Sequence, residues 1–98
     1  MTASRHWEQE RQEREMVIQS IGYGKIIRTR KITDERGTVI KKLSSTGIIT
    51  ILTLDEVIIT KIIARPTQLI PFFGSKDKIP QWLLRKSIYH KRLHLNEI

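Results

Sequence analysis

Four short runs of β-branched and other apolar residues, each followed closely by turn-forming residues, dominate the middle of this chain. The turns at Thr33–Gly37 and Ser44–Gly47 are rich in residues that tolerate tight-turn backbone angles. Because connections this short join antiparallel neighbours, the pattern predicts an antiparallel meander. The predicted strands are residues 25–32, 38–43, 48–53 and 57–64.

The two later runs are apolar at both odd and even positions, whereas the first two alternate with charged residues. Strands that are apolar on both faces are usually central and covered on both sides. We therefore expect residues 48–53 and 57–64 to form the centre of the sheet, with the first two strands nearer its edge.

A helix is expected on each side of the strands. The N-terminal helix runs from about Ser4 to Ile21 and stops at Gly22, since glycine adopts left-handed backbone angles at little cost. The sequence predicts an α+β fold of one domain: an N-terminal helix, a four-stranded antiparallel meander sheet and a C-terminal helix.

Residues 67–74, with Pro71, are expected to connect the sheet to the final helix. Asp77 is a candidate N-cap for that helix, with Pro80 in its first turn, where a missing N–H costs little. We expect four residues to mark its buried side: Trp82, Leu83, Tyr89 and Leu93.

Charge is the strongest functional signal. The 98 residues carry a formal net charge of +8, and residues 24–98 hold fifteen Lys and Arg against six Asp and Glu. A unit this basic attracts polyanions. Nucleic acid, RNA or DNA, is the partner it favours; an acidic face of a host or defence protein, or solubility alone, are the alternatives.

Features that the sequence lacks narrow the class of protein further. The chain has no cysteine, which excludes disulfides and thiolate chemistry and fits a reducing cytosol. No apolar signal-peptide core follows Met1, and no run reaches the roughly 18–20 apolar residues of a membrane span. We expect a cytoplasmic protein without a membrane partner; the oligomeric state stays open.

Cations cluster on the first two strands and on the last helix. Arg28 and Arg30 share one face of their strand because side chains alternate. These positions predict a nucleic-acid-binding surface, although a charged edge that resists aggregation explains the hairpin equally well. The predicted binding residues are Arg28, Arg30, Lys31, Lys41, Lys42, Lys91 and Arg92.

A second hypothesis is that the protein is an enzyme that cleaves RNA. Arg11 and Arg14 interrupt the apolar stripe of the first helix, and Lys61 interrupts an apolar strand that this helix could cover. Metal-free RNA cleavage needs a base, an acid and cations around the phosphate. Arg side chains that snorkel past the sheet are the alternative. The candidate set is His6, Arg11, Arg14, Lys61 and Arg65.

Neither a metal nor a cofactor is expected. His90 and His94 share a helix face, but zinc needs further ligands and the sequence has no His-Glu-x-x-His pattern. The chain has no P-loop, dinucleotide fingerprint or catalytic-triad pattern.

Four segments carry a resemblance. They are His6–Arg14, the stretches 46–51 and 59–68, and the closing residues 89–96. Together they resemble small uncharacterised proteins of phages and mobile elements of Gram-positive bacteria, across most of the chain.

The order of a helix followed by a meander also resembles the RelE- and barnase-type ribonuclease toxins, from which only architecture carries over. A helix after the sheet departs from that class.

Three function classes therefore stand: a nucleic-acid binder without catalysis, which we favour; a metal-independent, toxin-like ribonuclease; and a phage-encoded inhibitor of a host or defence protein. An aromatic content of 6% is low for a platform that stacks single-stranded bases.

Overall fold

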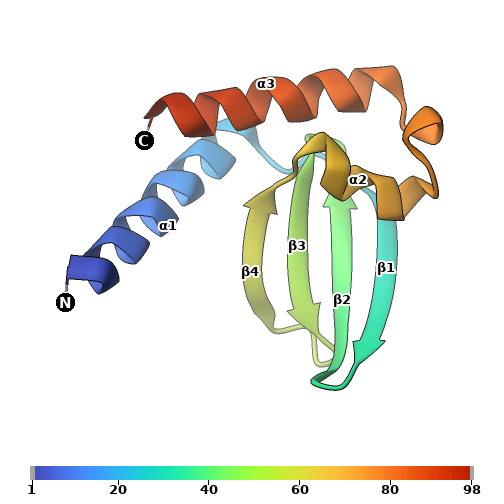
Figure 1. Cartoon of the computed structure of the whole chain (residues 1–98), viewed down its shortest axis with the longest axis horizontal. Coiled ribbons are helices and arrows are strands. Elements are labelled where there is room, and N and C mark those ends of the chain that lie inside the picture. Colours follow the sequence, from blue (N-terminus) through green and yellow to red (C-terminus); the bar gives the residue numbers. More distant parts are fainter. Residues whose placement is uncertain (1, 98) are drawn as a thin grey trace.

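The structure is a computed structural model that describes the backbone of residues 2–97 and the surroundings of the side chains of residues 9 and 11–92. It confirms the predicted α+β arrangement of an N-terminal helix, a four-stranded antiparallel meander and a C-terminal helix (Figure 1). The elements are α1 (Thr2–Ile21), β1 (Ile26–Asp34), β2 (Gly37–Ser44), β3 (Ile48–Thr53), β4 (Ile58–Ile63), α2 (Pro66–Phe73), a 3₁₀ turn η1 (Lys76–Lys78) and α3 (Gln81–Glu97).

The strand order is β1-β2-β3-β4, so β2 and β3 are central while β1 and β4 form the edges. The expectation that residues 57–64 are central, and that residues 38–43 lie nearer the edge, is therefore wrong. Ile58 and Ile59 at the start of β4 are half exposed. Only the end of β4 is covered on both sides, with Ile63 and Ile62 packed into different apolar clusters.

Residues expected to connect the sheet to the last helix form the short helix α2 instead. Pro66 occupies its first turn, where the fixed backbone angle of proline suits a helix. Leu69 and Phe72 are three residues apart, so they share a face and are buried against the sheet. This burial outweighs the cost of Pro71 inside the helix.

The last helix begins later than predicted. Asp77 lies in the 3₁₀ turn, and Pro80 precedes α3 rather than standing inside it. Ile79 is extended, as the residue before a proline prefers, and its side chain is buried in the core. Two backbone amides of the first turn, those of Leu83 and Leu84, donate to the Pro80 carbonyl at 3.1 and 3.0 Å.

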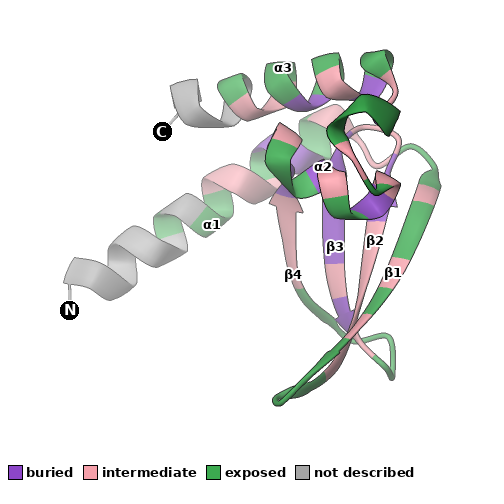
Figure 2. Ribbon diagram, turned by 45° about the vertical axis from the view of Figure 1, so that its right-hand side comes forward, coloured by how far each residue is buried: buried purple, intermediate pink, exposed green. Residues whose placement is uncertain are grey.

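Apolar side chains gather in two clusters on opposite faces of the sheet. The larger cluster lies beneath α2 and the start of α3, and it includes Leu43, Ile49 and Leu83. The smaller one joins Val17 and Ile18 of α1 to the sheet. Buried residues concentrate at the end of the sheet nearest the helices, while the far hairpin end is exposed (Figure 2).

Helix α3 crosses that covered end of the sheet (Figure 1) and is held there by polar contacts to strand ends. Ser87 Oγ donates to the Ala64 carbonyl, and His90 Nδ1–H donates to the Thr46 carbonyl at 2.8 Å. Gly47, with a φ of 86°, lies directly below Ser87, where a Cβ would be 3.5 Å from the Ser87 Cα. The small residues at this crossing allow the backbones to approach closely.

Candidate nucleic-acid interface

The predicted hairpin cations are divided between the two faces of the sheet. Arg30 of β1 pairs directly with Lys41 of β2, and Arg28 lies on the same face, as predicted for the two arginines. This face carries α2: the Arg28 and Arg30 guanidinium carbons lie 5.0 and 6.0 Å from the ring centroids of Phe73 and Phe72.

Lys31 and Lys42 lie on the opposite face of the hairpin because side chains alternate along a strand. Lys31 is exposed, whereas Lys42 Nζ is 4.0 Å from a carboxylate oxygen of Glu56. The hairpin therefore does not present one continuous basic surface. Its cations form a group of three beside α2 and a group of two on the other side.

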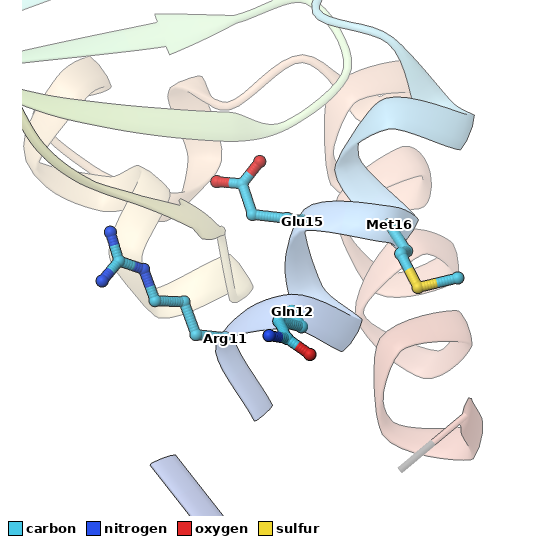
Figure 3. A pocket seen from close by; sticks show the side chains of 4 residues that line it. All are labelled: Arg11, Gln12, Glu15 and Met16. Atoms are coloured by element: carbon cyan, nitrogen blue, oxygen red, sulfur yellow. The ribbon is translucent and has the colours of Figure 1, made fainter. Parts of the chain in front are cut away.

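The candidate catalytic residues are also separated. Helix α1 does cover the Lys61 face of β4, and a cavity of about 590 Å³ is lined by Arg11, Gln12, Glu15 and Met16 (Figure 3). Arg11 and Glu15 point from α1 toward the strands in this view. Lys61 Nζ lies 3.7 Å from Glu15 Oε2 and 5.3 Å from the Tyr23 ring centroid. Tyr23 first, and then Glu15, hold the pKa of Lys61 above its ordinary value, against the effect of burial.

Arg14 and Arg65 have different neighbours from Lys61. Both are close enough to Lys91 of α3 that their charges lower its pKa, although burial of Lys91 is the larger cause. Lys91 Nζ donates to the Ile63 carbonyl at 3.2 Å, and Arg14 Nε is buried with no hydrogen-bond partner among the described residues. The side chain of the fifth candidate, His6, lies outside the described residues.

Lys91 gives a testable pH dependence. Its folded-state pKa lies below the ordinary value of 10.5, so the unfolded chain holds this proton more tightly. The penalty for burying the charge is full at neutral pH and is relieved as pH rises through the lowered pKa toward 10.5. The free energy of unfolding of the wild type, relative to Lys91→Met, should therefore increase with pH across that window.

Urea unfolding at a series of pH values measures this difference. Lys86→Met removes the same charge from the exposed side of α3 and is the matched control. A difference between wild type and Lys91→Met that stays constant with pH would contradict the burial of a charged Lys91.

Sequence reasoning missed the outer face of α3. Trp82 and Tyr89 were expected to be buried, but their side chains are 48% and 61% exposed. Leu83 is buried as predicted, and the side chain of Leu93 lies outside the described residues. The inner side of α3 is occupied by Leu83, Ser87 and Lys91, so the two aromatic residues face away from the sheet.

This outer face is aromatic and basic. Trp82, Lys86 and Tyr89 follow one another at four- and three-residue spacings, which places them on one side of the helix. Lys86 Nζ lies 5.5 Å from the Trp82 ring centroid. Arg85 and Arg92 are exposed beside them. We call these five residues, Trp82, Arg85, Lys86, Tyr89 and Arg92, the α3 platform.

No acidic residue occurs between Lys78 and Asn96 in the sequence, so the platform carries only positive charge along its length. Of its five members only Arg92 was predicted to bind nucleic acid; the neighbouring Lys91 turns inward to the Ile63 carbonyl. The signal that would have found the platform is the seven-residue spacing of two aromatic residues within an acid-free basic helix.

No protein-family model, curated protein or solved structure matches this chain. In the part of the chain that the structure describes, no helix has the length and apolar character needed to cross a membrane. Function is therefore inferred from the residues of this chain alone.

Proposed function

We propose that this protein binds single-stranded nucleic acid, RNA or DNA, through the α3 platform. The observation that carries the proposal is the exposure of Trp82 and Tyr89 on a helix face whose charged residues are all cations. Exposed aromatic rings stack on bases of any sequence, and Lys or Arg beside them neutralise the phosphates. The unpaired bases of a single strand are accessible to such rings, whereas those of a duplex are stacked inside it.

Charge favours nucleic acid over a protein partner for this face. Trp, Tyr and Arg are also enriched in protein–protein interfaces, and Ile88 adds some exposed apolar area beside the platform. However, a platform with three cations and no carboxylate needs a partner of dense negative charge. A phage-encoded inhibitor that grips a host protein would require an acidic partner surface of the same shape.

Salt dependence tests the proposal. Binding of a labelled single-stranded oligonucleotide, followed by fluorescence anisotropy, should weaken with salt with a logarithmic slope of about −2, as expected when three phosphate contacts release counterions from a single strand. The triple variant Arg85→Gln, Lys86→Gln, Arg92→Gln should lose most of that slope. Binding that is absent at low salt, or a slope unchanged in the triple variant, would remove the platform from the site.

A metal-independent ribonuclease is the second candidate, favoured by the cavity along α1, whose described lining residues all belong to that helix. Arg11 lines this cavity, and the Glu15 carboxylate beside Lys61 Nζ supplies a base near a cation. Such a pair serves general acid–base chemistry on the RNA 2′-hydroxyl while Arg11 holds the phosphate.

Incubation of RNA with the protein in EDTA tests cleavage. Loss of one transition-state contact costs roughly 100- to 1,000-fold in rate, so Arg11→Ala and Glu15→Gln should each nearly abolish it. Gln19→Ala, at an exposed position of the same helix that does not line the cavity, is the control. Intact RNA, or equal cleavage by all three variants, excludes this activity at the α1 cavity.

A further inference from the structure

A smaller cavity lies on the other side of the molecule from α1, between α2 and the sheet. Its volume is about 250 Å³, and it opens beside the first two strands. Neither proposed function uses it. The residues that line it are Arg30, Lys41, Ile49, Ile62, Thr67, Gln68, Pro71 and Phe72.

Two cations lie side by side in the lining of this cavity. Arg30 and Lys41 are directly paired in the β1–β2 ladder, so their side chains leave the sheet on the same face. Like charges directly opposite one another destabilise a sheet. Among the described residues, the ion pairs are Lys61–Glu15 and Lys42–Glu56, so neither Arg30 nor Lys41 is neutralised by a described carboxylate. An anion between them would relieve this repulsion.

The rest of the cavity combines hydrogen-bonding groups with an apolar wall. Thr67 contributes a hydroxyl group from the first turn of α2. Gln68 Oε1 accepts from the Arg65 backbone N–H at 2.8 Å, which leaves its Nε2 hydrogens available as donors. Ile49, Ile62 and Phe72 supply apolar surface. Arg30 is already positioned by its contact with the Phe72 ring, 6.0 Å from the centroid.

These features define the ligand class. A volume of about 250 Å³ falls just below the range of about 300–1,000 Å³ typical of pockets for drug-sized ligands. Two adjacent cations match a dianion, and a phosphate monoester carries a charge of about −1.5 to −2 at neutral pH. The planar Arg30 guanidinium can hold two phosphate oxygens at once. The apolar wall then suits a compact organic group attached to the phosphate.

We propose that the cavity between α2 and the β1–β2 hairpin binds a phosphate monoester, with the phosphate between Arg30 and Lys41 and its organic group against Ile49, Ile62 and Phe72. A free mononucleotide and the phosphorylated end of a nucleic-acid strand present this same chemistry. The site is independent of the α3 platform, because the two share no residue.

Two double variants of equal charge test the site. Arg30→Gln with Lys41→Gln removes both cations of the cavity, whereas Lys31→Gln with Lys42→Gln removes two cations from the opposite face of the same hairpin. Isothermal titration with adenosine monophosphate should show saturable binding to the wild type. The first variant should bind about 10- to 100-fold more weakly, since charge-assisted hydrogen bonds are lost, and the second should bind as the wild type does.

Adenosine without phosphate and inorganic phosphate are the ligand controls. Both should bind the wild type more weakly than adenosine monophosphate, because each lacks one half of the recognised group. The proposal is overturned if adenosine binds as well as its monophosphate, if no titration saturates, or if both double variants lose affinity equally. The wild-type titrations decide the question even if a variant fails to fold, and thermal unfolding of each variant identifies that case.

The Trp82→Ala, Tyr89→Ala double variant distinguishes the two possible ligands, a free mononucleotide and the phosphorylated end of a strand. This variant lacks the aromatic residues of the α3 platform. A 5′-phosphorylated oligonucleotide that binds this variant more tightly than its 5′-hydroxyl counterpart identifies the strand end as the ligand. Equal binding of the two strands, with adenosine monophosphate still bound, identifies the free mononucleotide. Retained binding of adenosine monophosphate in this background also separates the cavity from any failure of the proposed function.

Discussion

Replacing Trp82 and Tyr89 together with alanine should weaken the binding of single-stranded nucleic acid by about 30- to 1,000-fold. Each stacked base contributes roughly 1–3 kcal/mol, and a loss of about 1–2 kcal/mol at each of the two rings, about 2–4 kcal/mol together, corresponds to the stated range. Trp82 and Tyr89 are 48% and 61% exposed, so replacing them should remove few contacts from the hydrophobic core. Fluorescence anisotropy with a labelled oligonucleotide measures the affinity, and urea unfolding confirms that the variant stays folded.

The matched control is Trp82→Phe with Tyr89→Phe, which keeps two aromatic rings at the same positions and should retain most of the affinity. Ile88→Ala changes an exposed apolar residue of the same helix outside the platform and should have little effect. If the alanine pair binds as the wild type does, the platform is not the nucleic-acid interface. If Ile88→Ala is equally harmful, a protein partner becomes the better explanation of this helix face.

Replacing Leu83 with alanine should lower the free energy of unfolding by about 2–5 kcal/mol, as expected for a large buried aliphatic residue. Leu83 has no exposed surface and belongs to the cluster that joins α3 to Leu43 and Ile49 of the sheet. Domains of this size are stable by only about 5–15 kcal/mol. The midpoint of thermal unfolding should therefore fall by about 10 °C or more.

Ile88→Ala is again the control, because it removes apolar atoms from the same helix at a position that is 39% exposed. Its effect should stay near or below about 1 kcal/mol. Equal destabilisation by the two variants would mean that α3 does not dock through Leu83.

The order of elements was predictable because it depends on local chemistry. Turn residues at 33–37 and 44–47 separate runs of β-branched residues, and short turns enforce antiparallel neighbours. The position of β4 in the sheet was not predictable in this way. Apolar residues on both faces indicated a central strand, but Ile62 and Ile63 are covered by two different sets of helices at one end of an edge strand.

Helix α2 shows how tertiary contacts override propensity. Two prolines and a glycine within residues 66–74 indicated a connector. The three-residue spacing of Leu69 and Phe72 instead favoured a helix with one apolar face. That face stabilises the helix only when it packs on the sheet, and this contact exists only in the folded chain.

The sequence indicated which charged residues belong to the candidate sites better than it indicated how those residues lie relative to one another. The shared face of Arg28 and Arg30 follows from strand alternation, and the structure confirms it. The separation of Arg14 from Lys61 depends on how α1 packs against both α3 and β4, which no local pattern encodes. Nucleic-acid binding, ribonuclease activity and the resemblance to phage proteins and RelE-type toxins stay predictions.

Trp82 and Tyr89 were expected on the buried side of the last helix, but that side is occupied by Leu83 and Ser87, both fully buried. Ser87 lies over Gly47 and donates to the Ala64 carbonyl, a contact between distant parts of the chain that the local sequence does not indicate.

The polar contacts beneath α3 affect which substitutions the helix can accept without losing its contacts to the sheet. Ser87, His90 and Lys91 of α3 donate hydrogen bonds to main-chain carbonyl groups, those of Ala64, Thr46 and Ile63 respectively. Every residue has such a carbonyl group, whatever its side chain. These three hydrogen bonds therefore do not depend on which side chains the accepting residues carry, whereas the packing of Leu83 on Leu43 and Ile49 does. Substitutions on the outward side of α3 therefore change the surface that the helix presents and leave these docking contacts in place.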